Sequence, residues 1–420
     1  MLSEDMRRRS SLHGPADAGV GLYECARSLG RVQIGLVVPE FPPDTVGGGG
    51  TVFEGLALAL HARGHEVRVL TSATVGGPPC EDFRYPFPVA RVKQFKHFTS
   101  QYRTYMPPLP QELFRVRDFL RGSDVYHLHG YGVAFVDSVF RFLCDPNKTV
   151  FTSHGIPYTA PRAGGLLSAA YKLYDVAFGT NVLKRSCRLT AVSSFAAEQA
   201  EAAAGRPVEV IPNGFSVTVA RQVADPELRE FMSNGPYILC VGRIEPLKGF
   251  DLVVRALRRL RDNGSSLRLI VAGSDNSQQP SLAGLVAELD LASQVYFSGR
   301  LERSVLMALY QNAAYCVVSS YTESFSLVTL EAMSQGTPSV LSAVGGILDI
   351  ARDGENAILF SAGDVPGIVA AIERLESSPA LRERLVTDGR STIARFGWPE
   401  IAAKYEATYM ACVPAQHQLQ

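Results

Sequence analysis

The chain has 420 residues, of which 46% are hydrophobic and 20% are charged, and lysine plus arginine equal aspartate plus glutamate at 41 each. This composition is typical of a globular protein and excludes a disordered or fibrous one, and the balanced charge excludes an overall field that would attract nucleic acid or an anionic membrane. The length exceeds what one compact core usually holds, so two domains are expected.

Residues 1–30 contain a basic run that no apolar segment follows, so we expect a poorly ordered extension and no secretory signal. The sequence has no run of about 18 apolar residues, the length that spans a membrane. The seven cysteines are scattered and lack the C-x-x-C or Cys/His spacing of a zinc site. Such cysteine usage favours a reducing compartment, here the cytoplasm.

From residue 32 onward, short apolar strands alternate with helical segments. The expected strands of this first part are 32–39, 66–72, 124–130, 149–155, 188–193 and 208–212, and the expected helices are 51–63, 131–143, 166–184 and 195–204. Strands that alternate with helices of about ten or more residues predict a parallel sheet covered on both faces.

A segment of weak periodicity, 215–235, separates this part from a second alternation. The second part has expected strands at 236–243, 267–273, 294–299, 315–320 and 338–342, and helices at 250–262, 303–312, 327–335 and near the C-terminus. Ligands of open α/β sheets bind at the carboxyl ends of the strands. Two such domains facing each other would create a cleft, and we expect the function to reside there.

Two glutamates separated by seven residues, Glu323 and Glu331, flank the start of the helix expected from Leu327. Glu331 would lie about one turn into this helix, roughly 6 Å along its axis, and Glu323 on the preceding loop. Free amides at the helix N-terminus suit an anion, and a carboxylate accepts two or more hydroxyl donors. The pair could therefore contact hydroxyl-rich groups on either side of a diphosphate, although the spacing alone is a weak signal.

A second motif, VGRIEPLKG, follows the first strand of the same domain and contains Arg243 and Lys248. A guanidinium and an ammonium at the carboxyl end of a strand can neutralise a diphosphate leaving group. The alternative is that these cations form surface ion pairs with Glu245 or Asp251. Together, the two motifs predict cations, an anion-binding helix end and two carboxylates along one edge of one sheet.

These motifs resemble those of a known family, the retaining glycosyltransferases of the GT-B fold, in particular family 4, or glycosyl transferases group 1. The resemblance runs from residue 32 to about residue 410. Its markers are PPDTVGGGG, TSHG, TAVS, IPNG, VGRIEPLKGFD, VAGS, ESFSLVTLEAMSQGTP, VGGI and FGWPEIAAKY. Their joint occurrence in this order is specific, whereas no single one of them is.

The resemblance implies an α/β architecture of two doubly wound Rossmann-like domains that face each other across a cleft. After the extension at 1–30, residues 31–213 would form the acceptor-side domain. Residues 214–397 would form the nucleotide-sugar-binding domain, and a terminal helix at 398–413 would cross back to complete the first domain.

The same resemblance implies roles for individual residues. Arg243 and Lys248 would stabilise the departing diphosphate. Glu331 would bind the ribose hydroxyls and Glu323 the transferred sugar, which His154 would approach from the first domain. Further residues would surround the donor. They are the glycines of the first loop (Gly48, Gly49 and Gly50), two residues near the base (Gly299 and Arg300), Gly273 at a strand end, and the residues at the helix start (Phe325, Ser326, Leu327 and Val328).

Some of these positions have alternative interpretations. A single histidine after a strand, such as His154, is more often packed or capping, but its place at the carboxyl end of the strand favours function. Asn213 and Gly214 are predicted to form a hinge or turn that uses the left-handed conformation. Ser326 stands where the family most often has glycine, so it would crowd the donor sugar or add a hydroxyl contact, and Ala357 also replaces a usual glycine.

The sequence contains no Asp-x-Asp motif that would hold a metal on a diphosphate, so we expect no metal and no other cofactor. The expected donor is a UDP- or GDP-sugar. The acceptor would be a hydroxyl of a glycan, a lipid-linked molecule or a small molecule, with retention of anomeric configuration. A sugar-nucleotide epimerase or a phosphorylase on the same fold and a donor-binding pseudoenzyme subunit are the alternatives, and the two motifs together favour transfer.

The segment 83–121 mixes aromatic and basic side chains. It could form a wall of the acceptor site or a patch that touches a membrane surface peripherally. A strand followed by a helix with a solvated face explains the same pattern equally well.

Overall fold

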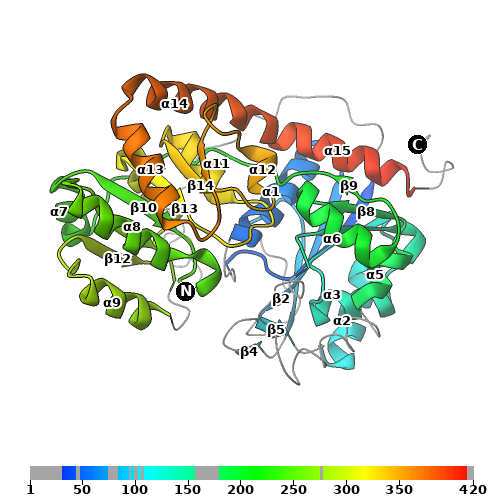
Figure 1. Ribbon diagram of the computed structural model, residues 1–420. Coiled ribbons are helices and arrows are strands. Elements are labelled where there is room, and N and C mark those ends of the chain that lie inside the picture. Colours follow the sequence, from blue (N-terminus) through cyan, green and yellow to red (C-terminus); the bar gives the residue numbers. More distant parts are fainter. Residues whose placement is uncertain are drawn as a thin grey trace, which may run out of the picture.

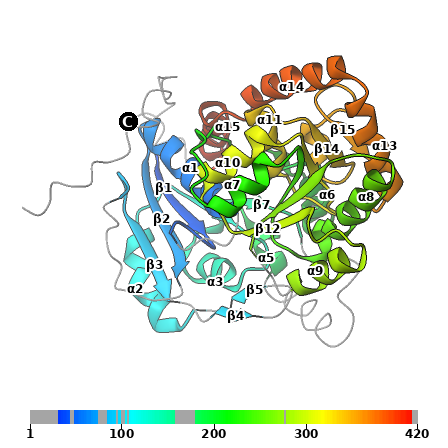
Figure 2. The same cartoon turned by 90° about the vertical axis from the view of Figure 1, so that its left-hand side faces the viewer.

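The computed structural model describes residues 31–43, 48–73, 84–93, 96–98, 103–105, 108–156, 179–274 and 278–413. Two parallel β-sheets, each covered by helices on both faces, form the two halves of the molecule (Figures 1 and 2). The predicted fold class, two doubly wound Rossmann-like domains, is therefore confirmed. The expected extension at 1–30 lies outside the described residues.

The first sheet has seven strands in the order β3-β2-β1-β6-β7-β8-β9. Its strands are β1 (Gln33–Val38), β2 (Glu66–Ala73), β3 (Val89–Lys93), β6 (Val125–His129), β7 (Thr149–Ser153), β8 (Arg188–Ala191) and β9 (Glu209–Val210). The helices of this half are α1 (Gly48–Ala62), α2 (Pro110–Leu120), α3 (Ala134–Leu143), α5 (Thr180–Arg185) and α6 (Ser194–Ala204). A separate antiparallel pair joins β4 (Lys96–Phe98) to β5 (Arg103–Tyr105).

The second sheet has six strands in the order β12-β11-β10-β13-β14-β15. They are β10 (Tyr237–Val241), β11 (Arg268–Ala272), β12 (Val295–Gly299), β13 (Tyr315–Val318), β14 (Ser339–Ser342) and β15 (Ile358–Phe360). Its helices are α7 (Pro226–Ser233), α8 (Phe250–Asp262), α9 (Gln279–Glu288), α10 (Arg303–Asn312), α11 (Leu327–Gln335), α12 (Ile347–Ile350), α13 (Val365–Glu376) and α14 (Pro379–Ile393), and α15 (Trp398–Met410) follows them.

The apolar strands are buried because helices cover both faces of each sheet. In β1, five of the six residues are buried, and the strand pairs in parallel with both β2 and β6. The order of the strands reverses at β1 and β6 in the first sheet and at β10 and β13 in the second. Such a reversal opens a crevice at the carboxyl ends of the strands, where open α/β sheets bind their ligands.

Several predicted helices agree with the structure, and the differences lie at the helix starts. Helices α8, α10 and α11 have the expected bounds, whereas α1 begins three residues before the expected position 51 and α3 three residues after 131. Most of the helix expected at 166–184 lies outside the described residues, and its end is α5.

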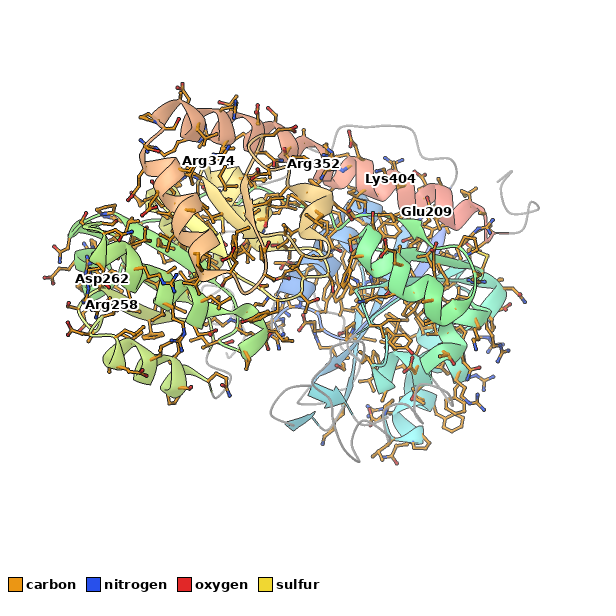
Figure 3. All side chains as sticks on the ribbon, viewed as in Figure 1. Glu209, Arg258, Asp262, Arg352, Arg374 and Lys404 are labelled. Atoms are coloured by element: carbon orange, nitrogen blue, oxygen red, sulfur yellow. A yellow bond between two sulfur atoms is a disulfide. The ribbon has the colours of Figure 1, made fainter. Side chains whose placement is uncertain are left out.

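Helix α15 returns from the second half and packs along α1 of the first. In Figure 1, α15 continues from α14 along the top of the molecule. Its buried residues, including Ile401, Tyr405 and Tyr409, join the apolar core on one face of the first sheet. Thr408 also donates a hydrogen bond of 3.1 Å to Glu209 of β9, which lies beside α15 in Figure 3. The domain boundaries at 213 and 397 stay a prediction.

The only tryptophan, Trp398, begins α15 and is buried against two glycines. A Cβ atom on Gly214 would lie 2.2 Å from the indole ring, and one on Gly55 of α1 would lie 2.4 Å from it. Neither Asn213 nor Gly214 has a positive φ. The predicted left-handed turn is therefore wrong, because Gly214 is needed for its small size beneath the ring.

A disulfide joins Cys187, just before β8, to Cys412, just after α15. The sequence analysis did not anticipate it, since 225 positions separate the two residues and no local spacing signals the pair. Disulfides are rare in reducing compartments, so this bond weakens the expectation, drawn from the scattered cysteines, that the protein resides in one. In the part of the chain that the structure describes, no helix is long and apolar enough to cross a bilayer.

The disulfide yields a prediction for stability. Because it closes a long loop, its loss is expected to lower the free energy of unfolding by up to about 5 kcal/mol. Thermal unfolding with and without a thiol reductant should show a lower midpoint for the reduced wild type. Cys412→Ser should begin at the lower midpoint and not respond to the reductant, whereas Cys144→Ser should respond like the wild type. Equal midpoints for oxidised and reduced wild type would contradict the bond.

Candidate functional site

A cavity of about 550 Å³ lies at the carboxyl ends of β10, β11 and β12 and is closed by residues of α10, α11 and α1. Its lining residues are Thr51, Val241, Gly242, Arg243, Ala272, Gly273, Ser274, Arg300, Leu301, Glu302, Arg303, Leu306 and Glu331. Thr51 comes from the first domain and the others from the second, so the cavity is shared between the two halves. Four of the predicted site residues, Arg243, Gly273, Arg300 and Glu331, meet here.

Glycine backbone forms one wall of this cavity. A Cβ atom on Gly273 would lie 1.7 Å from the carbonyl oxygen of Gly242, so no other residue fits there. The Gly273 amide donates a hydrogen bond of 2.9 Å to the Gly299 carbonyl, which ties the ends of β11 and β12 together. Gly299 thus shapes the wall near Arg300 and is not itself among the lining residues.

Glu331 lies on α11 with its side chain 12% exposed. One of its oxygens, Oε2, accepts a hydrogen bond of 3.1 Å from the Tyr310 hydroxyl, and Oε1 lies 3.7 Å from the Arg303 guanidinium. Burial raises the pKa of Glu331, and the positive charge of Arg303 and the Tyr310 hydrogen bond oppose this rise. Both partners hold the carboxylate toward the cavity.

Arg303 is a functional candidate that the sequence analysis missed. It begins α10, lines the cavity, and its guanidinium lies 5.7 Å from the ring centre of Phe215 in the segment that connects the two domains. Its guanidinium also approaches Ser216 of this segment, at 3.5 Å from the carbonyl oxygen. In the sequence, Arg303 is only a basic residue at the start of the helix that follows Arg300. Basic residues at such positions are common on protein surfaces, so the sequence does not single it out.

Lys248 and Glu323 form an ion pair beside the cavity. The Lys248 ammonium lies 2.5 Å from Glu323 Oε1, which also accepts a hydrogen bond of 2.8 Å from Ser320. Their side chains are 21% and 14% exposed, so the pair is partly shielded from water. The Glu323 carbonyl accepts a hydrogen bond of 2.8 Å from the Gly346 amide, which fixes the loop. The predicted cation and the predicted sugar-contacting carboxylate are thus direct neighbours.

Arg243 pairs with Glu245 at 3.2 Å, as the alternative interpretation of the motif expected. Its side chain is nevertheless 44% exposed, and it also lines the cavity. An exposed ion pair of this kind contributes little to stability. The pairing therefore leaves the guanidinium accessible to an anion in the cavity.

The start of α11 differs from the expected ligand-binding turn. Ser326 has a φ of +85°, in the left-handed region that favours glycine, which accounts for the glycine usual at this position. Its hydroxyl accepts a hydrogen bond of 3.3 Å from the Thr329 amide and bonds to the Thr329 hydroxyl at 2.8 Å. The hydroxyl therefore caps the helix, and the expected hydroxyl contact with a donor sugar stays a prediction.

The neighbours of Ser326 have other environments. Phe325 is buried, with its ring centre 5.7 Å from that of Phe396, so its side chain belongs to the core. Leu327 and Val328 are half-buried, and Leu327 packs against the cores of both domains. A Cβ atom on Gly48 would lie 2.6 Å from Leu327, which places the start of α1 directly against the start of α11.

The predicted glycines of the first loop, Gly48, Gly49 and Gly50, form the first turn of α1. The Gly50 amide donates a hydrogen bond of 3.0 Å to Glu40 Oε1. A carboxylate of this same chain therefore contacts the helix start where a phosphate was expected to approach. The loop residues 44–47, which precede Gly48, lie outside the described residues.

His154 follows β7, and its loop touches the loop of Glu323. A Cβ atom on Gly155 would lie 2.5 Å from the Ser324 hydroxyl, which shows how closely the TSHG and ESFS segments approach. His154 Nε2 lies 2.9 Å from Nδ1 of His129, at the end of the neighbouring strand β6. Burial lowers the pKa of His154 to about 4, so its ring is neutral at neutral pH.

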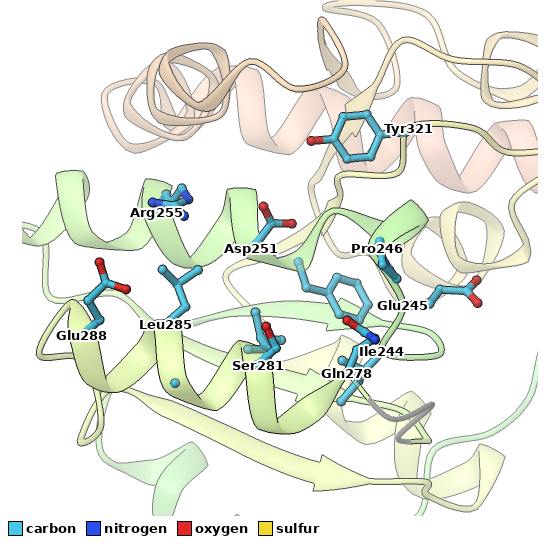
Figure 4. Close-up of a pocket in the computed structure, with 13 residues that line it drawn as sticks. Ile244, Glu245, Pro246, Asp251, Arg255, Gln278, Ser281, Leu285, Glu288 and Tyr321 are labelled. Atoms are coloured by element: carbon cyan, nitrogen blue, oxygen red, sulfur yellow. The ribbon is translucent and has the colours of Figure 1, made fainter. Parts of the chain in front are cut away.

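A second cavity, of about 510 Å³, lies between α8 and α9 (Figure 4). Asp251 and Arg255 of α8 and Ser281 and Glu288 of α9 line it, and Tyr321 lies at its upper side in this view. None of the predicted site residues is among its lining residues. The predicted site residues therefore make the first cavity the candidate functional site.

The aromatic and basic segment 83–121 is partly outside the described residues. In the described part, Phe114 of α2 is 72% exposed, and Phe142 of the neighbouring helix α3 is 66% exposed. Arg115 and Arg117 of α2 are also exposed. Within the described ranges, no three His, Cys, Asp or Glu side chains gather in a way that could hold a metal ion.

Two family models match the chain in succession. The model described as Glycosyltransferase Family 4 matches residues 46–219, and the one described as Glycosyl transferases group 1 matches residues 225–392. The chain is 28% identical over 393 residues to an uncharacterized glycosyltransferase of Methanocaldococcus jannaschii, covering 90% of this chain and 98% of that relative. It is 27% identical over 411 residues to a glycogen synthase of Mycobacterium tuberculosis, covering 93% of this chain and 97% of that relative.

Solved structures share the fold. Sucrose-phosphate synthase from Thermosynechococcus elongatus has a TM-score of 0.72 at 24% identity, covering 90% of this chain and 98% of that one. The Anabaena protein HepE in complex with UDP-glucose has a TM-score of 0.69 at 18% identity, covering 90% of this chain and 99% of that one.

Two doubly wound sheets with a cavity shared between the two halves form the GT-B fold, which these solved structures share. Within this class, the chain belongs to family 4, the glycosyl transferases group 1, since successive family models match both of its halves.

The buried histidines near the site yield a prediction for pH dependence. Burial lowers the pKa of His127 to about 3, so between this value and about 6.5 the unfolded chain binds a proton that the folded chain does not. Stability should therefore rise with pH across this window, with His127 contributing up to about 1.4 kcal/mol per pH unit.

Urea unfolding at several values between about pH 5 and pH 7 checks this prediction. The free energy of unfolding of His127→Gln should vary less steeply with pH than that of the wild type. Identical slopes for His127→Gln and the wild type would show that His127 does not titrate differently in the folded chain.

Proposed function

We propose that this enzyme transfers a sugar from a UDP- or GDP-sugar to an acceptor hydroxyl with retention of anomeric configuration and without a metal. The observation that carries the proposal is the shared cavity, in which the Glu331 carboxylate and the Arg243 guanidinium line one space at the carboxyl edge of the second sheet. A carboxylate suits ribose hydroxyls and a guanidinium suits a diphosphate. The similarity of the fold to HepE, solved in complex with UDP-glucose, supports the same type of donor.

In this mechanism, the bond between the anomeric carbon and the phosphate oxygen breaks, and its electron pair goes to the diphosphate. Arg243 and Lys248 stabilise the charge that develops there. The acceptor oxygen forms its bond to the anomeric carbon on the same face, and its proton passes to the leaving phosphate. Glu323, already paired with Lys248, contacts the transferred sugar, so the pair couples sugar position to leaving-group charge.

His154 approaches the donor sugar from the first domain, which also contributes Thr51 of α1 to the lining of the cavity. The acceptor is a hydroxyl of a glycan, a lipid-linked molecule or a small molecule. The exposed Phe114 and Phe142, with arginines beside them, favour a peripheral contact with a membrane surface, and this contact and a cytoplasmic location stay predictions.

A panel of nucleotide sugars tests the donor class. A donor that binds only the folded chain raises the unfolding temperature, and the shift grows with the ratio of free ligand to its Kd. One UDP- or GDP-sugar should therefore stabilise the protein, and Glu331→Gln should reduce this shift. With an acceptor, the product measured by NMR should have the anomeric configuration of the donor, in the presence of a chelator. An inverted product, or release of the nucleotide diphosphate only on adding a divalent metal, would contradict the mechanism.

Substitutions of the ion pair test the leaving-group assignment. Lys248→Ala and Glu323→Gln should each lower kcat by about 10²- to 10³-fold, because each removes a charged group that acts in the transition state. Circular dichroism should show that both variants stay folded. Lys404→Ala, on the exposed face of α15 (Figure 3), is the matched control and should retain wild-type turnover. Turnover unchanged in Lys248→Ala would overturn the assignment.

A further inference from the structure

A second histidine, His129, lies behind His154 and was not among the predicted site residues. It ends β6 and is 1% exposed, whereas His154 follows β7, the next strand of the sheet. The two strands pair in parallel, with His129 opposite Thr152, so their carboxyl ends bring the two imidazoles together. The distance between His129 Nδ1 and His154 Nε2 is 2.9 Å, which is a hydrogen bond.

The surroundings hold both rings in place. The Phe53 ring from α1 packs against each, at 4.9 Å from the His129 ring centre and 5.4 Å from that of His154. The ring of His127 lies 4.1 Å from that of His129 and is itself fixed by two hydrogen bonds of 2.7 Å, to Tyr409 and Thr152. The His127 nitrogens are therefore already used by other partners.

The other nitrogen of His129, Nε2, is buried and has no hydrogen-bond partner among the described residues. Burial lowers the pKa of both His129 and His154, so both rings are neutral and each carries one proton. The bond between them contains one of these protons, which leaves two arrangements.

In the first arrangement, His154 donates from Nε2, and His129 must then carry its proton on Nε2, as a buried donor without a partner. In the second, His129 donates from Nδ1, and its Nε2 is a buried acceptor without a partner. Among backbone groups, buried N–H donors without partners are rarer than under-satisfied acceptors, and the same order is taken for the two imidazoles. The second arrangement is therefore favoured, and it requires His154 to carry its own proton on Nδ1.

We propose that His129 is a positioning residue that fixes His154 as the Nδ1–H tautomer, so that His154 donates a hydrogen bond to an oxygen of the donor sugar. The inference rests on the proposed function for the identity of the ligand, and on the pair of histidines alone for the tautomer. A neutral N–H group binds an oxygen without placing a charge next to the developing cation at the anomeric carbon. His129 would thus act on the reaction through His154 and would not contact the substrate.

The tautomer is measured directly in the protein without a ligand. Long-range ¹⁵N–¹H correlation spectra of histidine-labelled protein distinguish the two tautomers, and His154→Gln identifies the His154 signals among the eight histidines. The wild type should show His154 protonated on Nδ1. A wild-type spectrum with the proton on Nε2 overturns the proposal, whatever the enzyme transfers.

Two variants of similar size then separate tautomer from packing. In His129→Asp, a carboxylate takes the place of Nδ1 and can only accept, so His154 should change to the Nε2–H tautomer. In His129→Asn, the amide nitrogen can still donate to His154 Nε2, so the Nδ1–H tautomer should remain.

The kinetic readout follows the tautomer. His129→Asp should lower kcat by about tenfold or more, with a smaller change in KM, because it removes a hydrogen bond to the reacting sugar, and His129→Asn should restore most of this loss. Tyr409→Phe, which removes a hydrogen bond from His127 and not from His129, is the control and should lower only the stability. Equal tautomers and equal kcat in His129→Asp and wild type would overturn the proposal. If no donor is transferred by any form, the proposed function fails, and the spectra still decide the tautomer.

Discussion

The arrangement of the two domains depends on the packing of Trp398. Its ring lies against Gly55 of α1 and against Gly214 at the start of the connecting segment, at distances that leave no room for a side chain on either glycine. The next residue of that segment, Phe215, donates its amide to the Phe396 carbonyl at 2.7 Å, two positions before the tryptophan. The forward and the return connection between the domains are therefore joined at one point, and the cavity is built from both halves beyond it.

The charged groups of the site are arranged so that each is compensated before a donor arrives. Lys248 is paired with Glu323, Arg243 with Glu245, and Glu331 is held between Tyr310 and Arg303. For the mostly buried carboxylates of Glu323 and Glu331, a charge without a partner would be costly, so their partners Lys248 and Arg303 offset this cost in the folded chain. In the proposed mechanism, the same pairs would keep the cations in place for a diphosphate, and a site fixed in this way needs little rearrangement when charge develops.

The fold and part of the site could be predicted because their signals are local. The alternation of apolar strands and helices determined the two sheets, and the bounds of α8, α10 and α11 followed from helical periodicity and end signals. Arg243 and Glu331 were placed on one sheet edge by their motifs, and the resemblance to the family added Gly273 and Arg300. The structure brings all four into one cavity. The sequence-based prediction was wrong where a partner distant in the sequence determines the conformation of a residue. Gly214 was assigned a left-handed turn because nothing close to it in the sequence signals the ring of Trp398 that packs against it.

The sequence by itself determined the fold class, the family and the sheet edge where the chemistry is expected, since these depend on periodicity and on motifs of a few residues. Only the tertiary structure decided which side chains that are far apart in the sequence come into contact. The bond between His129 and His154, the Arg303 contacts with Glu331 and Phe215, and the disulfide between Cys187 and Cys412 join residues from different strands, helices or domains. Such contacts depend on the crossing of α15 and on the register of neighbouring strands, and no short stretch of sequence contains that information.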